Sequence, residues 1–240
     1  AMGWMCWKSF PPFRRLGFRL QVLPELMAFG GWMTVSNVIS PLMVQMDRFV
    51  IGAMLSLAAV AYYATPFEMV TKLLMIPTAI TGVAFPAFAR LLAQQDFDAA
   101  GKLYWRSMRL IALGILLPVL ILALFAEDVL RLWLHGAFPA ESATVLRILV
   151  LGVFVNGLAH VPFAYLQGAK RADLTARIHL AEAPLYLLAL ALAVPRFGIV
   201  GAATAWTLRV TLDALAMHVG SSALGARLLR AQRPAVARTP

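Results

Sequence analysis

The sequence predicts an all-α integral membrane protein with about six transmembrane helices. Of the 240 residues, 61% are hydrophobic and only 13% are charged, whereas about a quarter of the residues in a soluble domain carry a charge. The mean hydropathy of +0.79 points the same way. The apolar runs are long and do not alternate with polar residues, so they fit helices better than the strands of a membrane β-barrel.

Six apolar stretches are predicted to cross the membrane, since one helical span needs roughly 20 such residues. They cover residues 28–53, 58 to about 92, 110–125, 145–166, 174–194 and 199–219. The first is interrupted by Asp47 and Arg48. The second is long for one crossing, and Pro66, Pro77 and Pro86 are expected to bend it. The third is short but strongly apolar, and the sixth begins with small residues that suit close helix packing.

Positive charge is distributed unevenly along this pattern. Six spans put both termini on one side, which the positive-inside rule assigns to the cytoplasm. That side holds fourteen of the 21 basic residues, namely Lys8, Arg14, Arg15, Arg19, Arg90, Lys102, Arg106, Arg109, Lys170, Arg171, Arg227, Arg230, Arg233 and Arg238. Membrane topology thus accounts for the net charge of +10, and nucleic acid is not an expected partner.

The predicted organisation has three parts. Residues 1–22 form a cytoplasmic basic segment, 23–220 the six-helix membrane lobe, and 221–240 a cytoplasmic basic tail. The tail is expected to be partly disordered from Ala223 onward. The first segment lacks the features of a signal peptide. The chain begins with Ala1 and not with Met, which suggests a piece of a longer protein.

The motifs of common enzyme and metal sites are not found. Cys6 is the only cysteine, so the sequence predicts neither an intrachain disulfide nor a cysteine metal cluster. There is no HExxH, Gly-rich phosphate loop, GxSxG or His/Cys metal spacing. We therefore predict no catalytic residue, no metal site and no enzyme. Single charges on separate helices suit the lining of a cavity better than a catalytic site.

Polar side chains inside the spans are the candidate substrate-binding or cavity-lining residues, because such groups usually face the interior of a helix bundle. The candidates are Ser36, Asn37, Ser40, Asp47, Arg48, Glu68, Lys72, Asn156, His160, Arg177, His179, Glu182, Arg209 and Asp213. Each also has a structural alternative, as a polar clamp between helices, an interfacial anchor or a pair that neutralises itself.

The fifth span carries the pattern most typical of a functional site. Thr175, His179, Glu182 and Tyr186 follow one another at steps of four, three and four, which places them on one helical face. Arg177 lies off that face, near the predicted cytoplasmic end, where it could meet the membrane surface or a phosphate.

Other spans carry polar residues at helical spacing. Ser36, Ser40 and Asp47 share one face of the first span, and Asn156 and His160 are four apart in the fourth. A histidine there is either a proton relay or a hydrogen-bonded clamp between helices, and the clamp is the commoner case.

Two pairs of opposite charge are also four residues apart. Glu68 precedes Lys72 in the second span, and Arg209 precedes Asp213 in the sixth. Such pairs either neutralise each other or form an ion or proton site that opens during transport.

Two segments carry a family resemblance. Residues 30–88 read GGWMTVSNVISPLMVQMDRFVIGAMLSLAAVAYYATPFEMVTKLLMIPTAITGVAFPAF. This stretch resembles the opening of the C-terminal half of Wzx-type oligosaccharide flippases of the MOP superfamily. Further along, ADLTARIHLAEAPLYLL and FGIVGAATAWTLRVTLDAL are similar to the last two helices of the same family.

The resemblance implies one lobe of a MATE/MOP-like transporter built from two six-helix lobes. It implies translocation of undecaprenyl-diphosphate-linked oligosaccharide from the inner to the outer leaflet of the bacterial inner membrane, for O-antigen or exopolysaccharide biosynthesis. The lipid-linked oligosaccharide and membrane lipid are the expected partners, together with a missing N-terminal lobe or a partner chain. No cofactor is expected apart from a coupling proton or Na⁺.

The same comparison suggests roles for the charged candidates. Asp47, Glu68 and Glu182 could bind sugar hydroxyls or a coupling cation. The cations available to meet the diphosphate are Arg48, Lys72, Arg177 and Arg209.

Two other functions remain open. One is a MATE-like exporter of small molecules or cations, and another is a non-transporting membrane scaffold subunit. A membrane-embedded glycan polymerase or transferase is disfavoured, because such enzymes carry a sizeable outer loop and residues 126–143 form only a short one.

Overall fold

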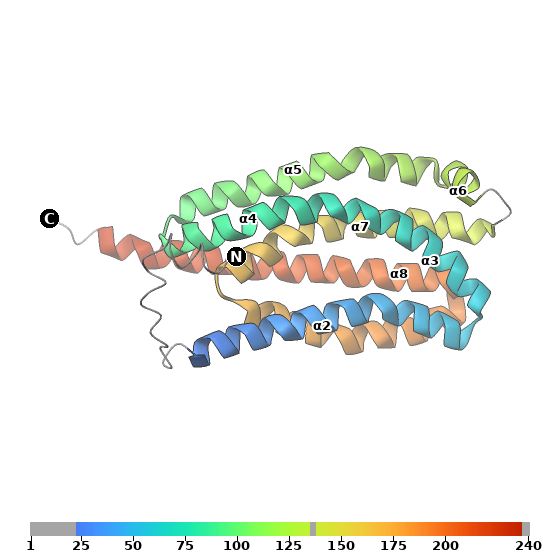
Figure 1. Ribbon diagram of the computed structural model, residues 1–240, viewed down its shortest axis with the longest axis horizontal. Helices are drawn as coiled ribbons and strands as arrows, with labels where there is room; N and C mark the ends of the chain where they lie inside the picture. The colour runs from blue at the N-terminus through green and yellow to red at the C-terminus, as the bar shows by residue number, and fades with distance from the viewer. Residues whose placement is uncertain (1–22, 135–137, 237–240) are drawn as a thin grey trace, which may run out of the picture.

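The computed structural model describes residues 23–134 and 138–236, and every element in these two stretches is a helix. The helices lie roughly along one long axis (Figure 1). In chain order they are α2 (Leu23–Met54), α3 (Leu57–Thr71), the single 3₁₀ turn η3 (Lys72–Leu74), α4 (Met75–Ala93), α5 (Phe97–Leu124), α6 (Ala126–Leu134), α7 (Ala140–Gly168) and α8 (Ala172–Val236).

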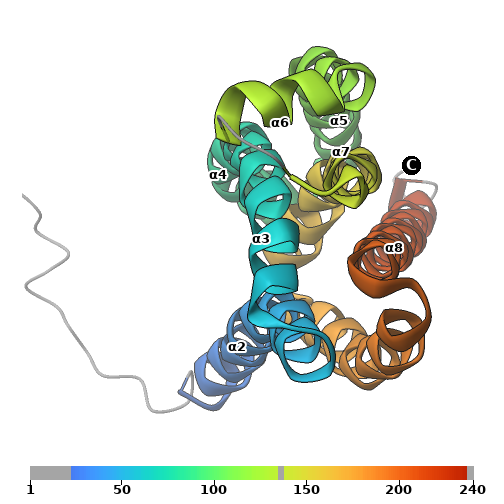
Figure 2. The same ribbon diagram turned by 90° about the vertical axis from the view of Figure 1, so that its right-hand side faces the viewer.

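Helix α8 is a hairpin of two arms. Gly198 has φ 56° and ψ −140°, a conformation that is open to glycine because it has no Cβ. The chain reverses there, so that residues 172–197 form a first arm and 199–236 a second arm that runs back beside it (Figures 1 and 2). A Cβ on Gly201 would lie 2.5 Å from the Ala193 carbonyl oxygen, so the turn also requires a close approach of the backbone.

The predicted number of crossings is confirmed. Four helical stretches are long and apolar enough to span a membrane, namely Leu57–Ala93, Phe97–Leu124, Ala140–Gly168 and Ala172–Ala231. The last holds both arms of α8 and therefore two crossings. Helix α2 is not among these stretches, but it is long enough for a sixth crossing, since its 32 residues extend about 48 Å, more than the hydrocarbon core of a bilayer.

The predicted bend in the second span is a break between α3 and α4. The turn η3 lies between Pro66 and Pro77. A proline inside a helix removes one N–H and leaves the carbonyl four residues earlier without its partner. For Pro66 that carbonyl belongs to Tyr62, and the Ser142 hydroxyl donates to it at 3.3 Å. A side chain from α7 thus replaces the N–H donor that Pro66 lacks.

Two short segments differ from the sequence prediction. The expected outer loop 126–143 contains α6, which crosses one end of the bundle (Figure 2). Its Ala126 and Leu130 are buried, whereas Leu132 and Trp133 are exposed. The tail from Ala223 onward was expected to be partly disordered. It differs from this prediction, because α8 continues as a helix to Val236.

Helix α7 occupies the centre of the lobe. Its apolar residues are buried on nearly all sides, including Leu146, Leu149 and Val153. Gly152 lies so close to Trp206 of the second α8 arm that a Cβ would come within 2.6 Å of its ring. Leucines elsewhere point outward, as in α5, and this apolar exterior is what a lipid-facing lobe requires.

Candidate functional site

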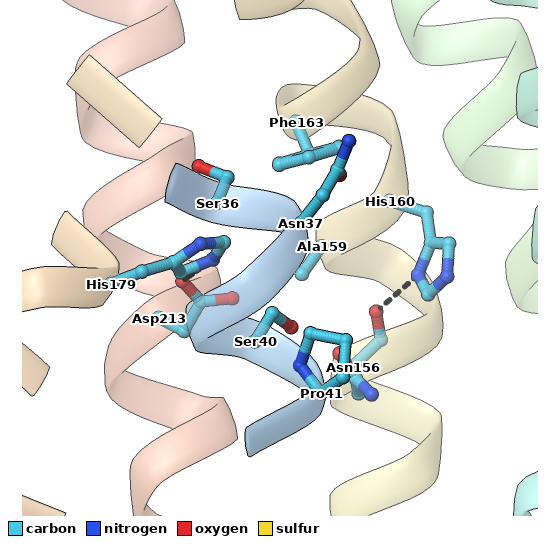
Figure 3. A pocket seen from close by; sticks show the side chains of 10 residues that line it. All are labelled: Ser36, Asn37, Ser40, Pro41, Asn156, Ala159, His160, Phe163, His179 and Asp213. Carbon is cyan, nitrogen blue, oxygen red and sulfur yellow. Dashed lines mark hydrogen bonds and ion pairs between the residues drawn. The ribbon is translucent and has the colours of Figure 1, made fainter. Parts of the chain in front are cut away.

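A polar cavity of about 290 Å³ lies inside the lobe, where α2, α7 and both arms of α8 meet (Figure 3). Four of the five spans with predicted polar candidates form these walls, and the second span does not. The lining residues are Ser36, Asn37, Ser40, Pro41, Asn156, Ala159, His160, Phe163, His179 and Asp213.

Helix α2 contributes its serine and asparagine face. Ser36 is buried, and its hydroxyl lies 3.4 Å from the Thr175 hydroxyl of the first α8 arm. Thr175 in turn donates to the Ala172 carbonyl at 3.0 Å, so Thr175 accepts the proton of Ser36. Asn37 and Ser40 line the open volume beside this contact.

Helix α7 forms the opposite wall. His160 Nδ1 lies 2.9 Å from the backbone carbonyl of Asn156, drawn as a dashed line in Figure 3. Because a carbonyl can only accept, Nδ1 carries the proton, and Nε2 is free to accept from a ligand or water when the ring is neutral. Phe163 stacks on the His179 ring at a centroid distance of 6.1 Å.

A group of charged side chains fills the space between the two α8 arms. His179 Nε2 lies 3.6 Å from Asp213 Oδ1, and Arg209 Nη1 lies 3.9 Å from Glu182 Oε2. None of these four side chains is more than 13% exposed. The Arg209 guanidinium also stands over the Tyr186 ring, 5.5 Å from its centroid.

Helix α2 adds a third carboxyl group to this region. Asp47 is fully buried and accepts hydrogen bonds from the Tyr63 hydroxyl at 2.5 Å and the Arg48 backbone N–H at 2.7 Å. Arg209 reaches towards the same helix, with Nη1 3.8 Å from the Met43 sulfur. We call Asp47, His179, Glu182, Arg209 and Asp213 the buried charge cluster.

The charge cluster is anionic when its carboxyl groups are ionised. It contains three carboxyl groups and a single guanidinium. Buried charges are normally paired, because the low dielectric of the membrane interior makes an unpaired charge costly. One or more bound protons or cations can therefore neutralise the carboxylate groups that are in excess of the guanidinium.

The predicted pair of Glu68 and Lys72 is wrong. Glu68 pairs with Arg48 at 3.2 Å and not with Lys72, which η3 places on an exposed surface. Arg209 has Glu182 of the other α8 arm as its ion-pair partner. At Glu68 the contact between helices thus replaces the predicted contact within one helix.

The four cations that the family resemblance assigned to the diphosphate do not line the cavity. Arg209 is in the charge cluster, and Lys72 is exposed. Arg177 is exposed too, and its guanidinium lies 5.7 Å from the Trp32 ring centroid. Arg48 covers the Phe67 ring and pairs with Glu68.

Several residues of this region are not among the residues predicted from the sequence. Tyr63 binds Asp47 from another helix, and Phe163 and Pro41 line the cavity. No local spacing connects Tyr63 to Asp47, and the apolar residues carry no signal of their own.

Comparison with known proteins identifies the family. The family model described as "Polysaccharide biosynthesis protein" matches residues 2–138. A Shigella flexneri protein with the provisional name O-antigen transporter is 39% identical over 202 residues, which are 84% of this chain and 47% of that protein. The chain thus spans about half the length of this relative.

Solved structures show the fold. A crystal structure of a MATE mutant matches 90% of this chain and 49% of its own, with a TM-score of 0.80 and 12% identity. A MATE family multidrug resistance transporter of the MOP superfamily, in an outward-facing conformation, matches with a TM-score of 0.79 and 12% identity. At this identity the likeness concerns the fold alone. The chain is a multi-pass membrane protein with the fold of half a MATE transporter, and it belongs to the polysaccharide biosynthesis protein family.

Proposed function

We propose that the chain is one lobe of a flippase that moves undecaprenyl-diphosphate-linked oligosaccharide from the inner to the outer leaflet for surface polysaccharide biosynthesis. The observation that carries this proposal is the polar cavity, inside an apolar lobe, next to a buried charge cluster. The family and the name of the Shigella flexneri relative support the same substrate class. The proposal assigns no catalytic step to the chain.

The cavity chemistry suits sugar hydroxyls. Its lining offers hydroxyls from Ser36 and Ser40, amides from Asn37 and Asn156, and the imidazole of His160. These groups both donate and accept hydrogen bonds, as a sugar does. Since no Lys or Arg of residues 23–134 and 138–236 lines the cavity, we assign the diphosphate to the other lobe or to the cleft between lobes. The volume of about 290 Å³ is at the small end for ligand pockets, so only part of the glycan would enter.

The charge cluster is proposed as the coupling site. A proton or Na⁺ would neutralise part of the excess carboxylate charge and would be released when the lobe changes conformation. Asp213 and His179 belong both to the cluster and to the cavity wall. Binding of glycan and binding of the ion would therefore be linked through the same side chains.

The proposed setting is the bacterial inner membrane, with both termini in the cytoplasm. The excess of basic residues on the side of the termini supports this orientation. A second lobe, from the same protein or a partner chain, would complete the pathway, and transport would proceed by rocking of the two lobes about the substrate.

A second candidate is a MATE-like exporter of small organic cations. The excess of carboxyl groups in the cluster favours it, because a cation could take the place of the proton. The two candidates differ in the charge of the cargo, so transport assays with organic cations and with lipid-linked glycan separate them.

Complementation tests the proposal. The chain alone, and the chain fused behind a matching N-terminal lobe, would be expressed in cells that lack their flippase. We expect surface polysaccharide only with the fusion. If the fusion folds in the membrane and several glycan types all stay inside, the flippase assignment is wrong.

A further inference from the structure

A second hollow lies on the outside of the lobe, away from the polar cavity. It has a volume of about 250 Å³ and lies between the beginning of α5, the end of α7 and the second arm of α8. We call it the interfacial groove. Its walls include Gly101, Tyr104, Trp105, Tyr165, Gly225 and Leu229. None of these residues lines the polar cavity.

The floor of the groove is aromatic but carries polar atoms. The Tyr104 hydroxyl lies 2.8 Å from His218 Nδ1 and 3.3 Å from Ser221 Oγ. The rings of Tyr104 and Tyr165 meet edge to face at 5.7 Å. Trp105 packs against Tyr104 and remains 54% exposed. Aromatic side chains with polar tips are typical of the boundary between membrane and water.

Two cations stand at the rim of the groove. Lys102 and Arg109 line an adjoining hollow that shares Gly101 and Trp105 with the groove, together with one acidic residue, Asp98. Arg109 Nε donates to the backbone carbonyl of Trp105 at 3.3 Å. Within the part of the chain that the structure describes, neither cation forms an ion pair.

The depth of these cations suits a lipid headgroup. The apolar part of α5 starts at the next residue, Leu110, and runs to the end of the helix. Arg109 and Lys102 therefore lie just outside the hydrocarbon, where basic side chains meet lipid phosphates. The aromatic floor continues from this level towards the acyl chains.

We propose that the interfacial groove binds the headgroup of an anionic membrane phospholipid. The phosphate would lie between Lys102 and Arg109, and the glycerol would cover Tyr104 and Trp105. Charge complementarity supports an anionic lipid over a zwitterionic one, since two cations face one carboxylate. Such a lipid would join α5 to the second α8 arm, which contact each other sparsely. This proposal does not depend on which cargo the lobe transports.

Trp105 supplies a direct readout, because bromine atoms on a lipid quench tryptophan fluorescence only at close range. The whole chain would be placed in phosphatidylcholine nanodiscs containing a small, equal fraction of brominated phosphatidylglycerol or brominated phosphatidylcholine. Subtracting the signal of the Trp105→Phe variant isolates Trp105 from the other tryptophans. We expect phosphatidylglycerol to quench at lower concentration than phosphatidylcholine.

Charge variants test the site itself. Lys102→Gln should weaken the apparent affinity for phosphatidylglycerol about fivefold, as expected for one basic residue near a headgroup. Arg196→Gln is the control, because it removes an exposed charge whose guanidinium also bonds a carbonyl four residues earlier but lies beside the Gly198 turn, at the other end of the lobe. Its effect should stay within about twofold, since a more distant charge is screened.

A third variant fills the groove without changing charge. A Cβ on Gly101 would have no neighbour within 4 Å, so Gly101→Leu should fold and should abolish the preference for phosphatidylglycerol. The proposal is overturned if the two lipids quench equally, if Arg196→Gln weakens binding as much as Lys102→Gln, or if Gly101→Leu keeps the preference. Complete displacement by an equal fraction of polyprenyl diphosphate would also overturn it, and would assign the groove to the transported lipid.

Discussion

His179 Nε2 lies 3.6 Å from Asp213 Oδ1, and this contact joins the two arms of the α8 hairpin at the wall of the polar cavity. Glu182 and Arg209 form the next contact between the same arms. The charge cluster and the cavity therefore share one wall, and a change in one is expected to affect the other. Four predictions follow from this arrangement and from the fold that supports it.

Arg209 is the cation on which the charge cluster depends. Replacing it in Arg209→Gln leaves the cluster's carboxyl groups without their guanidinium, and we expect a loss of about 3–5 kcal/mol in the free energy of unfolding. Denaturant titration of the purified chain in mixed micelles measures this. Arg177→Gln is the control, because Arg177 is exposed, and its loss should cost no more than about 1 kcal/mol. If both variants lose the same free energy of unfolding, Arg209 does not stabilise the charge cluster.

The hydrogen bond from Tyr63 to Asp47 is expected to stabilise the packing of α2 on α3. Tyr63→Phe removes the hydroxyl and leaves a buried carboxyl oxygen without its donor, at a cost of about 1.5–3 kcal/mol. Tyr62→Phe makes the same chemical change at a neighbouring exposed position, since Tyr62 is 40% exposed. Thermal unfolding of both variants in detergent compares them. A Tyr62 variant as unstable as the Tyr63 variant would contradict the assignment.

Gly198 makes the α8 hairpin possible. In Gly198→Ala the new Cβ meets no neighbouring atom within 4 Å, so any effect comes from the positive φ alone. We expect destabilisation of about 1–3 kcal/mol. Gly82→Ala also has open space around its Cβ but lies within α4, where alanine is favoured by about 0.5–1 kcal/mol. The two variants should thus change the unfolding midpoint in opposite directions, and a shared direction would count against the hairpin geometry.

Asn37 should control access of substrate to the polar cavity. Asn37→Trp would fill part of the volume of about 290 Å³, and we expect surface polysaccharide to fall by at least about tenfold in the complementation assay, as for a misplaced substrate. Val38→Trp is the matched control, because Val38 is 51% exposed and does not line the cavity. Membrane levels of both proteins would be measured by immunoblot. Unchanged export with Asn37→Trp would exclude this cavity from the pathway.

Much of the fold could be predicted from the sequence, because long apolar runs and the placement of basic residues report directly on the lipid environment. The stripe Thr175, His179, Glu182 and Tyr186 also faces the interior of the lobe, as its spacing predicts. Its first member meets Ser36, the next two meet residues of the second α8 arm, and Tyr186 lies under Arg209. Spacing within one helix was sufficient for this stripe, since all four residues face the interior.

Partners across helices could not be predicted in the same way. Glu68 and Lys72 are correctly spaced for a pair, yet η3 interrupts the helix at Lys72 and Arg48 approaches Glu68 from α2. Tyr63 was overlooked because its partner, Asp47, lies on a different helix. The packing of one helix against another depends on contacts throughout the lobe. The close approach of Gly152 to Trp206 is one such contact.

Reconstituted transport tests the central claim most directly. The chain fused to a matching N-terminal lobe would be placed in vesicles that carry a polyprenyl-diphosphate-linked oligosaccharide in one leaflet. An impermeant glycosidase would report how fast the glycan reaches the other leaflet. The account predicts rapid exposure with the fusion, and slow exposure with the fusion that carries Asn37→Trp. Exposure no faster than in empty vesicles, together with uptake of organic cations by the same protein, would contradict it.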